Sequence, residues 1–260
     1  MAPLAYSVAP QLALLVVGAV VAGLVQGLSG FAFGMVAMSI WIWGIDPREA
    51  TVMAVFGGLC GQVLAAFTIR RRAATPEFLP FLIGGLIGVP IGTYLLPHIG
   101  VTQFKLLIGS ILAIGCPLML ATPRIHYVST IGRTGDGAAG VAGGVIGGIS
   151  GLTGIAPAIW CALRGYDKVG QRELLQNFNI VMLTATMIAL IWRGTVTKAM
   201  IPNLGIVAGA LLVPSVLGAK IYQQLSDTSF RRVLLMLLTL SGLVLVASAI
   251  SFSGFAHAER

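Results

Sequence analysis

The chain has 260 residues, of which 57% are hydrophobic and only 9% are charged. Its mean hydropathy of +0.96 excludes a water-soluble fold with a polar surface and indicates an integral membrane protein. The formal net charge of +8 comes from basic residues that lie between apolar runs. The orientation of a chain in the bilayer accounts for such residues, and we therefore expect no nucleic-acid partner.

Eight apolar runs are candidate membrane segments, since a helix needs about 20 apolar residues to cross a bilayer. They lie at residues 11–44, 50–69, 78–96, 102–121, 137–163, 174–192, 199–219 and 230–252. The first and the fifth are longer than one crossing requires, and each contains a glycine-rich interruption near its middle. The sequence therefore predicts an all-α polytopic membrane protein with about 8–10 membrane helices, whose first and fifth segments are broken.

The two broken segments begin two halves of the chain that match one another at a slowly drifting offset of 121 to 126 residues. The matching pairs are Ser29-Gly30 with Ser150-Gly151, Asp46 with Asp167, Arg48-Glu49 with Arg172-Glu173, and Phe104-Lys105 with Phe230-Arg231. Small loop insertions produce such a drift. We expect a first repeat over residues 8–122, a linker over 123–134 and a second repeat over 135–252, an internal duplication of the kind that many transporter folds share.

The distribution of basic residues indicates how the two repeats are oriented. If each half crosses the membrane four times, the basic residues divide evenly between the two faces, without a positive-inside bias. If the chain turns back at each break, eleven lie inside and five outside. The inside group is Arg70, Arg71, Arg72, Arg124, Arg133, Arg164, Lys168, Arg172, Lys220, Arg231 and Arg232, and the outside group is Arg48, Lys105, Arg193, Lys198 and Arg260. The positive-inside rule favours this second arrangement, with inverted repeats and both termini outside.

The breaks are the first candidate for a functional site. A helix that stops within the bilayer leaves amide and carbonyl groups that must face protein, water or a ligand. The helix that starts after a break directs free N–H groups and a positive dipole end at that space, which suits an anion. Ser29, Ser150 and Thr153 add hydroxyl donors. The alternative is that the glycines mediate close helix packing, which is what we expect for most of them taken singly.

Few other polar residues lie within the apolar runs. The most notable are Gln26, Gln62, Gln176, Asn177 and Asn179. Asn177 and Asn179 point about 200° apart on a helix. One could face the substrate while the other binds a neighbouring helix, and hydrogen bonding between helices is an equally good account of both. No acidic residue is expected deep within a span, because Asp46, Glu49, Asp167 and Glu173 lie near segment ends.

Arg48 and Arg172 occupy corresponding positions before the second segment of each half. The simpler interpretation is that they are interfacial residues, since basic side chains commonly flank membrane spans. The alternative is that they attract anions and guard the two mouths of an anion pathway.

The stretches "GLSGFAFGMVAMSIWIWGIDPREAT" and "GGISGLTGIAPAIWCALRGYDKVGQRELLQNF" resemble the duplicated glycine-rich motif of the sulfite exporter TauE/SafE family, membrane transporters built from two repeats. This resemblance covers nearly the whole chain and implies a multi-pass protein of the cell inner membrane that exports small anions such as sulfite or organosulfonates. The motif positions are Ser29, Gly30, Phe31, Phe33 and Gly34 in the first half and Ser150, Gly151, Thr153, Gly154 and Pro157 in the second. Phe31 and Phe33 stand where many relatives carry more glycine, and two phenyl rings suit an anion with an organic part.

The function we expect is therefore secondary transport of a small anion by alternating access about a site between the two breaks. An anion channel, or a transporter of another organic anion such as a carboxylate, is the alternative. The expected substrate-binding residues are the ten motif positions together with Gln26, Asn177 and Asn179. The expected partners are a small anionic substrate and the lipid bilayer, with a proton or sodium ion as candidate coupling ion and a second copy of the chain as candidate partner in a homodimer.

Enzyme activity, a metal site and a cofactor are not expected. The sequence has no His pair at metal-binding spacing, no acid pair within a span and no nucleophile with a base nearby, since His98, His126 and His257 fall in loops or in the tail.

Overall fold

A computed structural model describes residues 3–68, 78–121, 132–166 and 168–222, and the short stretches 235–236, 239–240, 242–247 and 249–250. Within these ranges the chain forms helices and no strands. Five helical stretches are long and apolar enough to cross a membrane: Pro10–Ser29, Phe78–His98, Val101–Leu118, Glu173–Trp192 and Lys198–Ile221. The predicted class, an all-α polytopic membrane protein, is confirmed.

The helices follow one another in the order in which the apolar runs occur. In the first half they are α1 (Pro3–Ser29), α2 (Phe33–Trp41), α3 (Pro47–Thr68), α4 (Phe78–Leu95), the 3-10 turn η1 (Leu96–His98) and α5 (Val101–Ala121). In the second half they are α6 (Gly132–Ser150), α7 (Ile155–Leu163), α8 (Lys168–Trp192), the 3-10 turn η2 (Lys198–Met200) and α9 (Ile201–Tyr222). The first and fifth segments each form a long and a short helix, separated by residues 30–32 and 151–154.

Each short helix turns back along the long helix before it. In the first half the indole Nε1 of Trp41, at the end of α2, donates to the carbonyl of Leu15 on α1 at 3.2 Å. In the second half the indole Nε1 of Trp160 on α7 donates to Oδ1 of Asp136 on α6 at 2.7 Å. The chain therefore reverses at both breaks, and each broken segment is a helical hairpin.

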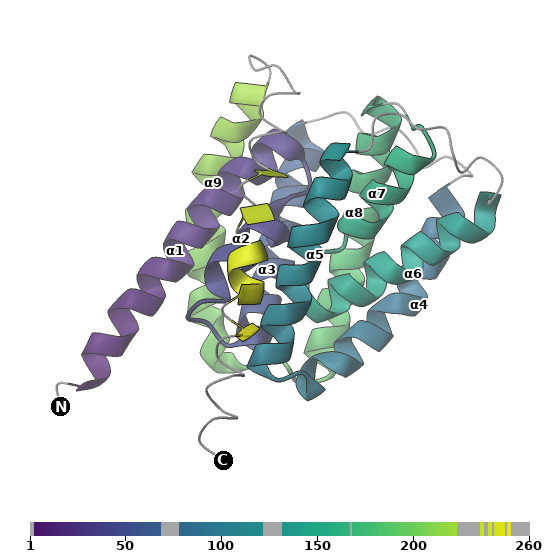
Figure 1. Ribbon diagram of the computed structural model, residues 1–260. Coiled ribbons are helices and arrows are strands. Elements are labelled where there is room, and N and C mark those ends of the chain that lie inside the picture. Colours follow the sequence, from purple (N-terminus) through teal and green to yellow (C-terminus); the bar gives the residue numbers. More distant parts are fainter. Residues whose placement is uncertain are drawn as a thin grey trace.

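The long helix of each hairpin lies along a helix of the other half of the chain, α1 along α9 and α6 along α4 (Figure 1). Glycines allow this close approach. A Cβ added to Gly27 would lie 2.8 Å from the backbone nitrogen of Ala219, and one added to Gly148 would lie 2.8 Å from the carbonyl oxygen of Val89. The packing interpretation holds for these glycines, because a larger residue would meet the backbone of the neighbouring helix.

Burial distinguishes the short helix α2 from the outer helices. Eight of the nine residues of α2 are buried, as expected for a helix that is apolar on every side. On the outer helices, by contrast, large apolar side chains such as Ile87 on α4, Ile191 on α8 and Val213 on α9 are exposed. Such outward-facing apolar surface suits contact with lipid.

Contacts between helix ends and the turns beside them identify one end of the bundle. Arg48 Nη2 donates to the carbonyl of Pro97 at 2.9 Å, and the Arg193 guanidinium lies 5.2 Å from the ring centroid of Tyr94. The Lys105 ammonium lies 5.6 Å from the ring of Trp43. Three of the five basic residues of the predicted outside group thus gather near the end of α4.

Candidate functional site

The two breaks have the same backbone conformation at their first residue. Gly30 and Gly151 have φ values of 82° and 75°, in the left-handed region that L side chains rarely adopt. Each glycine donates its N–H to the carbonyl four residues earlier, Gly30 to Gln26 and Gly151 to Gly147, both at 2.7 Å. The matched glycines therefore end α1 and α6 in the same way, as glycines commonly do at helix C-termini.

The two breaks also touch one another. A Cβ added to Gly34, in the first turn of α2, would lie 2.8 Å from the carbonyl oxygen of Gly151. A Cβ added to Gly154 would lie 3.3 Å from Cδ2 of Phe31 and 3.2 Å from both amide atoms of Asn179 on α8. Sequence positions more than a hundred residues apart thus come together, and five of the predicted site residues are among them.

The first break satisfies most of its backbone groups with its own side chains. Ser29 Oγ accepts from the amides of Phe31 at 3.4 Å and Ala32 at 3.1 Å. Gln26 Oε1 accepts from the amide of Phe33 at 2.9 Å. On the carbonyl side, Gln62 Nε2 donates to Gly30 O at 2.8 Å. Three amides that the break frees are therefore already bonded, which is what a buried helix end requires.

The second break has a different hydrogen-bond pattern. Ser150 Oγ donates to the carbonyl of Ile146 at 2.7 Å, as Ser29 Oγ does to Val25 at 2.8 Å. Thr153 Oγ1 donates to Asn179 Oδ1 at 2.6 Å. Among the described residues, no side chain accepts a hydrogen bond from the amides of residues 152–156. In the first break, by contrast, the amides of Phe31, Ala32 and Phe33 are bonded and only those of Gly34 and Met35 lack an acceptor among the described residues.

Other predicted site residues differ in burial and in their contacts. Phe33 is fully buried, with its ring against Gly57 and 6.0 Å from the ring of Trp41 in an edge-on contact. Asn177 is half-buried, whereas Asn179 is only 1% exposed. Pro157 packs beside Gly143, where an added Cβ would lie 2.9 Å from its ring.

Arg48 is the first of the two residues predicted to attract anions. The Arg48 guanidinium binds the carbonyl of Pro97, and its backbone amide donates to Asp46 Oδ1 at 2.9 Å. Arg48 thus ties the start of α3 to the loop after α4. The side chain of Arg172 lies outside the described residues, although its backbone belongs to α8.

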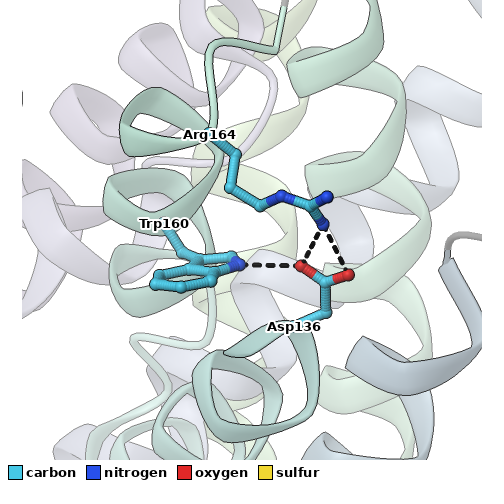
Figure 2. A network of polar contacts seen from close by, with 3 residues as sticks. All are labelled: Asp136, Trp160 and Arg164. Atoms are coloured by element: carbon cyan, nitrogen blue, oxygen red, sulfur yellow. Dashed lines mark hydrogen bonds and ion pairs between the residues drawn. The ribbon is translucent and has the colours of Figure 1, made fainter. Parts of the chain in front are cut away.

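Asp136, which the sequence analysis did not single out, lies in the second turn of α6 and is only 2% exposed. Both of its carboxylate oxygens accept from Arg164 Nη1 at 2.7 Å, and Oδ1 also accepts from Trp160 (Figure 2). The helix α6 begins at Gly132, before the apolar run that the sequence predicts from residue 137. In the sequence Asp136 is a single acidic residue among small residues. The hairpin formed by α6 and α7 is what places Trp160 and Arg164 next to it.

These features define a class: a polytopic helical membrane protein in which the tips of two helical hairpins meet. The family model described as Sulfite exporter TauE/SafE matches residues 15–245, and the chain belongs to this family. Searches of curated proteins and of solved structures found no match. Membership of this family makes the chain a multi-pass membrane protein for transport of the sulfite and anion exporter type.

Proposed function

We propose that the chain is a secondary transporter of the cell inner membrane that exports small anions such as sulfite or organosulfonates. Its binding site lies where the two glycine breaks meet. The observation that carries this proposal is the close approach of Gly34 to the carbonyl of Gly151, which brings the tips of both hairpins to one place. Helix N-termini bind anions without a buried lysine or arginine, because their amides and dipole favour negative charge.

We also propose that the chain is built from two inverted repeats, residues 8–122 and 135–252. Two observations support this: the left-handed glycines recur at matching positions, and each long hairpin helix lies along a helix of the other half. Alternating access would then be a rocking of the two repeats about the site between them. The end of the bundle near Arg48 and Arg193 would face outward. The opposite end, with the eleven basic residues of the predicted inside group, would face the cytoplasm.

Single cysteines test this orientation. Thr197 and Thr134 are exposed and lie in the loop before α9 and in the first turn of α6. We expect a membrane-impermeant thiol reagent to label Thr197→Cys in intact cells, and Thr134→Cys only in inverted membrane vesicles. A variant without Cys60, Cys116 and Cys161 serves as the background. Labelling of both positions from the same side would contradict the inverted arrangement.

Anion binding is tested on purified full-length protein in detergent. A ligand at about 100 times its dissociation constant adds about 2.7 kcal/mol to stability, and the melting temperature should rise by several degrees. We expect this for sulfite or a small sulfonate, with sodium chloride at equal ionic strength as the control. If the strongest effect comes from carboxylates, the alternative substrate class is correct. If no anion moves the melting curve, the proposed site is wrong.

A channel would use the same breaks as a constriction open to both sides. Counterflow in proteoliposomes separates the two functions, because only a carrier accumulates labelled anion against unlabelled anion inside. A proton or sodium gradient applied in the same assay identifies the coupling ion by which gradient drives accumulation.

A further inference from the structure

The hydrogen bonds at the two breaks are unequal, and we infer that the second break alone binds the anion. The donors are the amides at the start of α7 together with Nδ2 of Asn179, while Gln26 and Ser29 act as structural caps of the first break. This inference rests on the proposed function and specifies which half of the site holds the substrate.

The first break is closed by acceptors that belong to the protein. Gln26 is 3% exposed, and its Oε1 bonds the amide of Phe33 at the start of α2. Ser29 Oγ bonds the amides of Phe31 and Ala32. An anion would need these same three amides, and it would also meet the lone pairs of the two capping oxygens. Only the amides of Gly34 and Met35 remain without an acceptor among the described residues, so the first break offers an anion fewer donors than residues 152–156 of the second break.

The second break lacks the corresponding caps because its residue at the position of Gln26 has no side chain. At the offset of 121 residues that relates Gly30 to Gly151, Gln26 corresponds to Gly147. Gly147 has no side chain to reach the start of α7, and the methyl group of Thr153 packs against it instead. The hydroxyl of Thr153 is also engaged, since it donates to Asn179. The amides of residues 152–156 thus keep no side-chain acceptor within the described part of the chain.

Asn179 is a second and independent indication of a ligand. Its side chain is almost completely buried, and Oδ1 is occupied by the Thr153 hydroxyl. None of the hydrogen bonds among the described residues is donated by Nδ2, which lies 3.2 Å from the position of a Cβ on Gly154. A buried amide donor aimed at an uncapped helix start is suited to an oxygen of an anion.

Gln176 adds a further buried donor on the same helix. Its Nε2 has no partner among the described residues, and it lies three residues before Asn179, on the same side of α8. Two unpaired side-chain donors and the amides of α7 together favour a compact oxyanion with several acceptor oxygens, such as a sulfite or sulfonate group. The ring of Phe31 lies beside Gly154, at the edge of these donors.

The test measures sulfite and methanesulfonate binding by full-length protein carrying near-isosteric substitutions. Asn179→Leu should raise the dissociation constant at least about tenfold, because a donor to a charged group is lost. The melting temperature without ligand should also fall, because the buried Thr153 hydroxyl loses its acceptor, so the dissociation constant is the measurement that decides. Gln26→Met is the matched variant of the first break. It should lower the melting temperature without ligand, because the Phe33 amide loses its acceptor, and it should leave the dissociation constant within about twofold.

Gly154→Ala provides a second variant of the second break if Asn179→Leu fails to fold. Its methyl group would lie 3.2 Å from the Asn179 amide and should also weaken anion binding. Equal loss of anion affinity in Gln26→Met and in the second-break variants would overturn the unequal division while leaving the proposed function intact. Absence of anion binding by the unmodified protein would overturn both.

Discussion

Gly144→Ala is expected to cost about 3 kcal/mol or more of folding free energy, the upper range for overpacking. A Cβ at this position would collide with the carbonyl oxygen of Gly85 and lie 3.0 Å from the Cα of the same residue. Both atoms belong to the backbone of α4, so no side-chain rotation relieves the contact. Gly88 and Gly140 meet the partner backbone along the same seam, so α4 and α6 would have to separate along their length.

The matched control is Gly209→Ala, on the outer side of α9. A Cβ there would have no atom within 4 Å. Alanine is favoured over glycine inside a helix by about 0.5–1 kcal/mol, so this variant should be as stable as the parent or slightly more stable. Thermal unfolding in detergent and the yield of monodisperse protein measure both variants. Equal melting temperatures for the two would refute the packing account of Gly144.

Asp136→Leu is expected to destabilise the protein by about 3 kcal/mol, the lower end of the range for breaking a buried ion pair. The substitution leaves the Arg164 guanidinium without its carboxylate and the Trp160 indole without its acceptor. The Arg164 side chain is 23% exposed, so water partly compensates and the upper end of the range does not apply. The loss should also disturb anion binding, because this network holds the end of α7 against α6 (Figure 2).

A double-mutant cycle separates the charge effect from simple loss of packing. Replacing both partners, Asp136→Leu with Arg164→Met, should recover most of the lost stability, because buried ion pairs exchange for apolar residues at little net cost. The residual loss should be about 1 kcal/mol, for the unsatisfied indole of Trp160. Chemical or thermal unfolding of the four proteins gives the coupling energy. A double variant as unstable as the sum of the two single variants would contradict the ion-pair account.

The breaks could be located from the sequence because their signals are local. Segments too long for one crossing, with glycine near the middle, mark where helices stop, and Gly30 and Gly151 are the residues that adopt the left-handed conformation there. The family resemblance was also visible in these stretches, and the family model that covers residues 15–245 confirms it.

The roles of individual polar residues could not be assigned in the same way. Gln26 and Asn179 are both amides within apolar runs, yet Gln26 caps the break in its own hairpin while Asn179 faces the break of the preceding hairpin. Phe31 and Phe33 are two residues apart, yet Phe31 lies beside Gly154 whereas Phe33 packs in the core. These differences depend on which helix lies opposite, and a single sequence does not contain that information.

The sequence by itself determined the membrane class, the two breaks and the family, because hydropathy and glycine conformation are properties of short stretches of chain. Only the tertiary structure decided that the two breaks touch at Gly34 and Gly151, and that the second keeps more free donors than the first. It also decided the burial of Asp136 against Arg164. The physical reason is that hydrogen bonds between distant residues depend on helix packing, and in this chain packing is set by how closely the glycines let the backbones approach.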